Sequence, residues 1–314
     1  MYIFKPTLSK LQFVTTFVLF FTLKLLAFSQ SPYVLVLGVA QDGGYPQAGC
    51  KKDCCRAVWE LKIPHQSVSC IALIDPVSRE QWIFDATPNF TEQLHHLQAT
   101  TKYQNLSGIF LSHAHIGHYT GLMNLGREAM GTQKIPVYTM PKMKSFLETN
   151  GPWSQLVSLN NIAIQAIENQ QEVILNERIK VIPFRVPHRD QFSETVGFQI
   201  ITKNKKLIFI PDIDKWQKWE QDLESVVKGN DVLLLDGTFY QGGEINRPMS
   251  EVPHPFVVET MELLKSLPDQ TRSKVHFIHL NHTNPILRSK TKERSFVQKN
   301  GYKVAFENQK IDLQ

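Results

Sequence analysis

The chain has 314 residues, of which 42% are hydrophobic and 20% charged, a composition typical of a folded globular protein that excludes a disordered or fibrous one. Its formal net charge is +5, but the lysines at 5, 10 and 24 carry +3 of it, which leaves +2 for the rest. That small, dispersed excess gives no reason to expect nucleic acid as a partner.

The N-terminal segment 1–29 has the parts of a signal peptide. Two lysines precede the mainly apolar stretch 11–23, and small residues up to Ser29 offer a cleavage site. Lys24 interrupts the apolar run before it reaches the ~20 residues that span a bilayer. We therefore expect cleavage near Ser29 and an exported protein, periplasmic or secreted, with one domain at 30–314. An uncleaved anchor, which would attach the protein to the membrane, is the alternative.

Predicted strands and helices alternate through the rest of the chain. Segments rich in β-branched and aromatic residues predict strands at 33–40, 68–75, 81–87, 106–112, 178–186, 196–201, 206–212, 231–236 and 274–280. Apolar residues at helical spacing predict helices at 89–98, 117–130, 215–227 and 255–266. The segment 150–161 is expected to be a loop near the cleft. Strands followed by helices in both halves favour a layered α/β protein.

Three histidines fall within six positions directly after the strand 106–112. His113 and His115 are two residues apart, so in an extended segment both rings turn to the same side and can share a metal ion. His118 follows near the start of the next helix and can face the same cavity. Neutral imidazole binds several divalent metals, so this pattern does not select one of them.

Ligand-type side chains also stand at the ends of later predicted strands. They are His188, Asp212 and His279, with His282 as a second choice for His279. A single histidine on an apolar strand is most often structural. Several such residues at strand ends indicate a site, because clefts open at strand ends in layered α/β folds.

The motif SHAHIGH (112–118), followed in order by those later ligand-type residues, resembles the metallo-β-lactamase superfamily over nearly the whole chain after residue 29. Four further segments resemble the branch that includes the PQQ biosynthesis protein B group and phosphodiesterases such as the tRNA 3′-processing nuclease and the phosphonate-pathway cyclic phosphodiesterase. These segments are GVAQDGGYPQAGC (38–50), DATPNFTEQL (85–94), VLLLDGTFY (232–240) and HLNHTNPIL (279–287). The resemblance implies a four-layer αβ/βα sandwich with a metal site along one edge of its two sheets.

The resemblance also implies the ligands. A first metal ion would be held by His113, His115 and His188, and a second by His118 and His279, with Asp212 bridging the two. Family members usually carry an aspartate where this chain has Gly117. That carboxylate ligates the second metal and orients the attacking hydroxide. Three protein ligands and an open position remain without it, which is a workable catalytic arrangement. We expect one or two divalent ions, with zinc first and manganese or iron as alternatives.

Two further residues are candidates for the chemistry. With Asp212, His254 is the predicted catalytic residue: it precedes the helix 255–266, where by resemblance a histidine contacts a phosphoryl oxygen or protonates the leaving group. The alternative is a residue of a proline-flanked turn. Asp236 ends a strand and either supports a ligand histidine or bonds to backbone amides around Gly237. Gly38, Gly43 and Gly44 resemble the family's first turn, which implies that they let the backbone pass close to the site; the alternative is an ordinary turn.

Cys50, Cys54, Cys55 and Cys70 are the four cysteines. Three of them fall within six residues and could hold a structural zinc ion with Cys70 or His65 as the fourth ligand. Disulfides are the alternative, because the expected export and the even count both permit them.

The sequence thus favours a metal-dependent hydrolase that acts on a small-molecule phosphodiester or related ester. One alternative is a cofactor-maturation protein like the PQQ protein, which would use a single redox metal ion for an oxidative step. The expected export fits that alternative poorly. A non-catalytic metal-binding protein is the third possibility, and a true β-lactamase fits less well than these because the branch segments match elsewhere.

Overall fold

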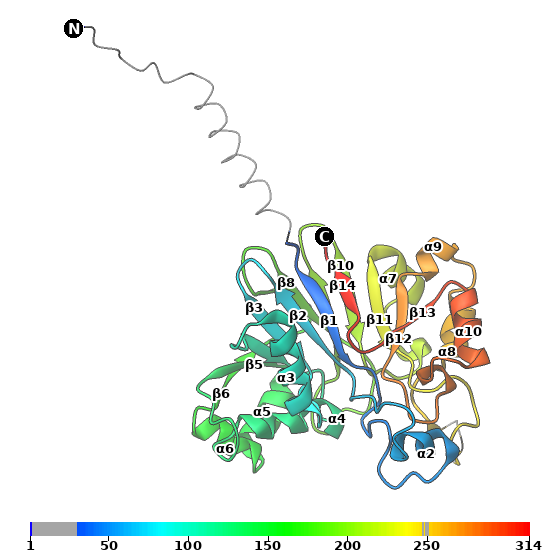
Figure 1. The fold of residues 1–314 in the computed structure, drawn as a ribbon, viewed down its shortest axis with the longest axis horizontal. Helices are drawn as coiled ribbons and strands as arrows, with labels where there is room; N and C mark the ends of the chain where they lie inside the picture. The colour runs from blue at the N-terminus through cyan, green and yellow to red at the C-terminus, as the bar shows by residue number, and fades with distance from the viewer. Residues whose placement is uncertain (2–29, 247, 249–250) are drawn as a thin grey trace. The chain divides into compact units, whose positions relative to one another are not determined.

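Two seven-stranded sheets form the centre of residues 32–314 in this computed structural model (Figure 1). The first sheet contains, in spatial order, β14 (Lys310–Asp312), β1 (Tyr33–Gly38), β2 (Cys70–Asp75), β3 (Glu80–Phe84), β4 (Gly108–Phe110), β5 (Ile135–Thr139) and β6 (Ile162–Ala166). The second contains β13 (Lys303–Val304), β12 (Val275–Ile278), β11 (Val232–Asp236), β10 (Lys206–Ile210), β9 (Val196–Ile201), β8 (Lys180–Arg185) and β7 (Val173–Ile174). In the first sheet, neighbouring strands pair antiparallel from β1 to β3 and parallel from β3 to β6. In the second sheet, they pair antiparallel from β7 to β10 and parallel from β10 to β13.

Helices cover the outer face of each sheet. Against the first sheet pack α3 (Phe90–Thr101), α5 (Pro141–Thr149) and α6 (Trp153–Ser158), and against the second α7 (Leu223–Gly229), α8 (Val257–Leu263) and α10 (Lys292–Lys299). The remaining short helices are α2 (Asp53–Trp59), α4 (Ile116–Tyr119), α9 (Asp269–Arg272) and the 3-10 turns Thr120–Leu125, Trp216–Lys218 and Pro285–Leu287. This arrangement confirms the predicted four-layer αβ/βα sandwich.

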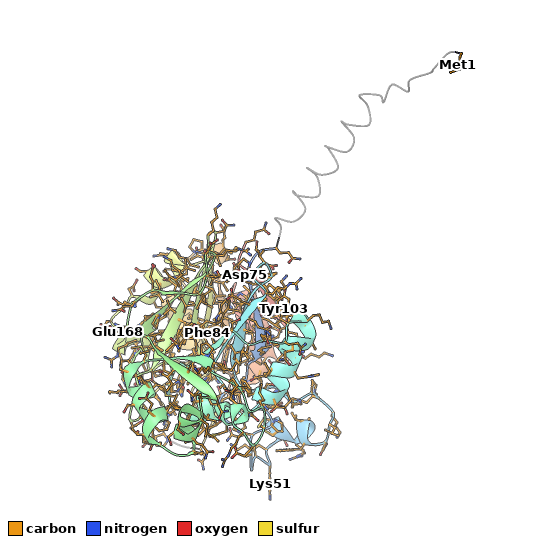
Figure 2. The ribbon with its side chains drawn as sticks, turned by 90° about the vertical axis from the view of Figure 1, so that its left-hand side faces the viewer. Met1, Lys51, Asp75, Phe84, Tyr103 and Glu168 are labelled. Carbon is orange, nitrogen blue, oxygen red and sulfur yellow. The ribbon has the colours of Figure 1, made fainter. Side chains whose placement is uncertain are left out.

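The apolar strands are buried on both faces, which explains why they read as continuous hydrophobic runs in the sequence. On β1, Val34 and Val36 face the second sheet, whereas Leu35 and Leu37 pack among the helices of the first. Phe84, which Figure 2 shows among the strands, meets Phe198 of β9 edge to face at a centroid distance of 5.3 Å. Aromatic contacts of this kind join the two sheets.

Three predicted elements differ from the structure. The expected helix 117–130 is only α4 followed by a 3-10 turn, because backbone groups that would continue the helix bond to the segment after β3 instead. Gly121 N donates to Ala86 O (2.9 Å), and Ala86 N donates to His118 O (2.9 Å). The expected helix 215–227 is broken, since the Asp222 carboxylate accepts a hydrogen bond from Ser225 N and starts α7 there. The expected loop 150–161 contains α6.

The structure describes residues 1, 30–246, 248 and 251–314. The predicted signal peptide therefore lies almost wholly outside the described residues. Among those residues, none of the helices has the length and apolar character that crossing a membrane requires.

Candidate metal centre

The chemistry-bearing side chains gather at the carboxyl ends of strands from both sheets. They are Asp42 after β1, Asp85 after β3, His113 and His115 after β4, His188 after β8, Asp212 after β10, Asp236 ending β11 and His279 after β12. Within each sheet these strands run in the same direction, so their ends share one edge. Ala114 N donates to Ser193 Oγ (2.8 Å) and Val196 N donates to Ser112 O (3.1 Å), which fixes the histidine loop against β9 of the second sheet.

A first group of ligand atoms lies around Asp212. His113, His115, His188 and Asp212 each present one ligand atom, and these atoms all lie within 4.8 Å of one another. Asp212 Oδ2 lies 3.3 Å from His113 Nε2 and 3.2 Å from His188 Nε2. His115 Nδ1 lies 3.8 Å from the same oxygen. Tetrahedral ligands with bonds of ~2.0–2.1 Å to zinc lie ~3.3 Å apart, so the group fits one metal ion at its centre.

The inward-facing nitrogens of this group make no hydrogen bond. These buried atoms are His113 Nε2, His115 Nδ1 and His188 Nε2. The opposite ring nitrogens of two rings are occupied: His113 Nδ1 donates to Ser112 Oγ (3.0 Å) and His188 Nδ1 donates to Asp214 Oδ1 (3.2 Å). Buried polar atoms normally have partners, so three ring nitrogens aimed at one point fit a divalent cation as their common partner.

A second group contains a residue that the sequence did not reveal. It consists of Asp42, His118, Asp212 and His279, again with ligand atoms within 4.8 Å. Asp42 Oδ1 lies 3.0 Å from His118 Nε2 and 3.3 Å from His279 Nε2. The only signal for Asp42 was an acidic residue directly before the glycine pair of the turn after β1. Asp212 belongs to both groups, so the two share one carboxylate.

Two buried carboxylates orient the histidines in the same way. Asp85 accepts directly from His118 Nδ1 (2.7 Å), and also from Ser112 Oγ (2.9 Å), to which His113 Nδ1 donates. Asp85 therefore holds the His118 ring directly and the His113 ring through a hydroxyl, which leaves Nε2 of both rings for a ligand. Asp85 was not predicted. Its φ of 70° is a conformation that aspartate tolerates better than most residues.

Asp236 plays the equivalent part in the second sheet. It accepts from His254 Nδ1 (2.9 Å) and from Thr238 Oγ (2.6 Å), and His279 Nδ1 donates to that hydroxyl (2.9 Å). It also accepts from the backbone amides of Ile213 (3.1 Å) and Thr238 (2.8 Å). Asp236 therefore supports the ligand His279 through Thr238 and also bonds to backbone amides, so both roles predicted for it from the sequence are present in the structure.

His254 lies beside the shared carboxylate rather than in either four-residue group. Its Nδ1 is 3.0 Å from Asp212 Oδ1 and its side chain is buried. Burial lowers the pKa of an imidazole, but Asp212 and Asp236 raise the pKa of His254 to about 10. This ring therefore holds a proton at neutral pH in the metal-free chain.

The electrostatics of the metal-free chain hold some ligand groups, but not all, in the states that bind metals. Burial raises the pKa of a carboxylate, yet His188 and His254 hold the pKa of Asp212 well below its usual value. Burial and the neighbouring His118 lower the pKa of His113 well below its usual value. Ionised carboxylate and neutral imidazole are the forms that coordinate a cation. Burial lowers the pKa of an imidazole, but Asp212 raises the pKa of His188 to about 9 and Asp85 raises the pKa of His118 well above its usual value, so metal binding would displace protons from these two rings.

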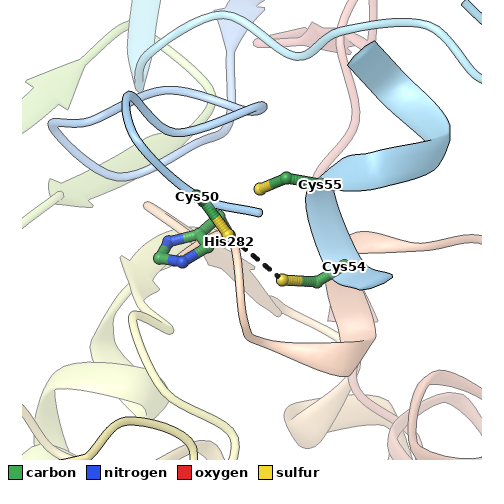
Figure 3. Close-up of side chains that lie close together, drawn as sticks. All are labelled: Cys50, Cys54, Cys55 and His282. Carbon is green, nitrogen blue, oxygen red and sulfur yellow. Dashed lines mark hydrogen bonds between the residues drawn. The ribbon is translucent and has the colours of Figure 1, made fainter. Parts of the chain in front are cut away.

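Three of the four cysteines form a separate cluster with a histidine. Cys50, Cys54, Cys55 and His282 present ligand atoms within 4.8 Å of one another (Figure 3). The Sγ atoms of Cys50 and Cys54 are 3.8 Å apart, the spacing that tetrahedral bonds of ~2.3 Å to zinc require. His282 Nδ1 is buried without a hydrogen bond. The four side chains therefore fit a structural zinc ion.

This cluster corrects the predicted fourth ligand. Cys70 is wholly buried on β2, where its Sγ donates to Asp85 O (3.4 Å), and it is outside the cluster. His65 is exposed and also outside it, whereas His282, the second choice for His279, belongs to it. All four cysteines are free thiols, so the disulfide alternative is not what the structure contains.

We expect Cys54→Ser to lose one zinc ion per chain and to lower the thermal midpoint of unfolding by about 5–10 °C, because the ion stabilises only the folded chain. Elemental analysis and calorimetry measure the two effects. Cys70→Ala is the matched control and keeps its zinc. Equal zinc content in Cys54→Ser and the unaltered protein would contradict the assignment.

Comparison with known proteins gives a family match and several full-length relatives. The beta-lactamase superfamily domain matches residues 81–280. Coenzyme PQQ synthesis protein B of Methylorubrum extorquens (strain PA1) is 24% identical over 313 residues, which covers 90% of this chain and all of that protein. The protein of the same name from Pseudomonas putida (strain W619) is 28% identical over 317 residues, with the same coverage.

Solved structures share the fold. Zinc-bound PqqB from Methylobacterium extorquens superposes with a TM-score of 0.74 at 22% identity and covers 90% of this chain and all of that one. A diphosphatase of the PhnP family gives a TM-score of 0.63 at 17% identity, with coverages of 90% and 97%. The short form of human tRNase Z gives 0.53 at 16%, with coverages of 90% and 99%. Since the superfamily domain matches more than half of the chain, this protein belongs to the beta-lactamase superfamily.

Proposed function

We propose that this protein is a metal-dependent hydrolase of a phosphodiester or a related small-molecule ester. One observation carries the proposal: two four-residue ligand groups, each suited to one cation, share the carboxylate of Asp212. Ions held in this way would lie side by side. Metal pairs about 3.5–4 Å apart are typical of enzymes that displace one oxygen of a phosphoester by another.

Different residues of the chain would have different roles in such a reaction. Bound divalent ions would lower the pKa of water from 15.7 to about 7 and polarise the ester. Asp212 holds its carboxylate between the two groups, while Asp85 and Asp236 fix the orientation of the rings. His254, whose Nδ1 is held by Asp236, would act on the substrate through its Nε2. That nitrogen would donate its proton to the leaving oxygen as a hydroxide, whose own proton has passed to solvent, bonds to phosphorus and the ester bond breaks.

The relatives support two candidate functions. The diphosphatase and tRNase Z that share the fold are named for the cleavage of phosphate bonds, which supports the hydrolase. The relatives named for coenzyme PQQ synthesis match over their full length and cover 90% of this chain, which supports a role in cofactor maturation as the second candidate. In that case His113, His115 and His188 would hold a single redox-active ion such as iron.

Metal content and turnover together separate these candidates. The full chain is purified without chelators, analysed for metals, and assayed with an aryl phosphodiester. We expect two ions at the centre and hydrolysis that His118→Ala abolishes, while the exposed His95→Ala leaves it unchanged. One bound iron and no hydrolysis would contradict the hydrolase and favour cofactor maturation. A centre without any ion would contradict both.

A further inference from the structure

We propose that Asp42 supplies to the second metal ion the carboxylate that Gly117 does not provide. The chain would thus keep a four-ligand second position by taking its acidic ligand from the loop after β1 instead of from the histidine motif. This inference deepens the proposed function and rests on it for the presence of ions at the centre.

Asp42 occupies the space that a side chain at residue 117 would need. A Cβ built on Gly117 would lie 2.5 Å from Asp42 Oδ1, 2.7 Å from its Cα and 2.8 Å from its Cγ. Contacts below 3.0 Å to backbone and carboxylate atoms cannot be relieved by a small rotation. Asp42 in its present position and any side chain at 117 therefore exclude each other, as expected of two alternative sources for one carboxylate.

The carboxylate of Asp42 is aimed at the nitrogens that a second ion would use. The Nδ1 atoms of His118 and His279 are committed to Asp85 and Thr238, so their Nε2 atoms are left to face Asp42 Oδ1. Its side chain is only 17% exposed. Asp42 and Asp212 also present oxygens to the same group, and a cation between two carboxylates offsets their mutual repulsion.

The loop that carries Asp42 is tied to the strand end that carries His279. Gln41 N donates to Leu280 O (2.9 Å), and Leu280 N donates to Val39 O (2.7 Å). Gly44, at a φ of 70°, closes the turn by donating to Gln41 O (2.7 Å). The residues before Asp42 are thus fixed beside Leu280, and the turn that follows Asp42 is closed onto Gln41, which holds the carboxylate in place before any ion binds.

The test moves the acidic side chain from position 42 to position 117. Asp42→Gly removes the carboxylate and clears the space beside Gly117. The double variant Asp42→Gly/Gly117→Asp then restores an acid at the position usual in the family, and residue 117 has no left-handed φ that would strain an aspartate. Asp312→Asn, which removes one carboxylate from an exposed pair with Lys310, is the charge control. Each protein is equilibrated with a zinc buffer and its zinc content per chain is measured.

We expect Asp42→Gly to hold one zinc ion fewer than the unaltered chain, with at least about 100-fold weaker affinity at that position. The double variant should regain the ion, which also shows that the loss is not caused by misfolding. Equal zinc content in Asp42→Gly and the unaltered chain would overturn the inference. A double variant with no more zinc than Asp42→Gly would also overturn it. An unaltered chain that binds both ions but hydrolyses no ester would refute the proposed function and leave this inference intact.

Discussion

Replacing Asp212 by asparagine is expected to empty both metal positions and to lower hydrolysis by at least about 10³-fold. The carboxylate belongs to both ligand groups, and its Oδ2 lies within 3.8 Å of three imidazoles. Metal ions contribute several kcal/mol to the stabilisation of such transition states, and each 1.36 kcal/mol corresponds to a factor of ten. Asparagine keeps the size of the side chain and removes the charge.

The matched control for this variant is Asp214→Asn, two residues along the chain. Asp214 contacts His188 Nδ1 and Lys218 but belongs to neither ligand group. Removing a partner of a ligand typically costs 10–100-fold in metal affinity, so this variant should bind the first ion, which His188 ligates, more weakly and the second ion unchanged. Metal content and kcat/KM are measured for both proteins. Asp212→Asn with unchanged metal content would show that Asp212 is not the shared ligand.

Replacing His254 by glutamine is expected to lower kcat by about 10²–10⁴-fold without loss of metal, because a positioned proton donor contributes that much to catalysis. Glutamine can donate a hydrogen bond to Asp236 but cannot transfer a proton. Asp236 would keep its bonds from Ile213 N, Thr238 N and Thr238 Oγ, so the fold should survive.

Two outcomes would contradict the role of His254 as the proton donor. If His254→Gln loses a metal ion, His254 is a ligand or a structural support. If kcat is unchanged, the leaving group needs no proton from this ring. Single-turnover kinetics on the metal-loaded protein, with elemental analysis of the same sample, separates these cases.

The sequence predicts the layers because each sheet is buried on both faces. Strands such as β9 and β11 are apolar runs whose limits follow from burial alone. The common location of the ligands at strand ends could also be predicted, since parallel strands bring their carboxyl ends to one edge. His113, His115, His188 and Asp212 therefore lie together as the resemblance implies.

The features that sequence reasoning missed depend on contacts between distant segments. Asp42 meets His118 across 76 positions, and Asp85 meets it across 33. Both acids lie in segments that carry the resemblance, 38–50 and 85–94, but no spacing marked them as partners of a histidine, and only the packing of loops brings them to one. The fourth member of the cysteine cluster, His282, lies in the segment that follows β12, so no local spacing pointed to it. The helix α4 ends early for the same reason, because backbone groups of His118 and Gly121 bond to Ala86.

Anomalous X-ray diffraction at the zinc edge, from crystals of the zinc-loaded protein, would show whether two metal ions share Asp212. We expect two peaks about 3.5–4 Å apart on either side of the Asp212 carboxylate, one among His113, His115 and His188 and one among Asp42, His118 and His279. A third peak is expected at the cysteine cluster. A single peak at the centre, or a pair that Asp212 does not join, would contradict the sharing of Asp212.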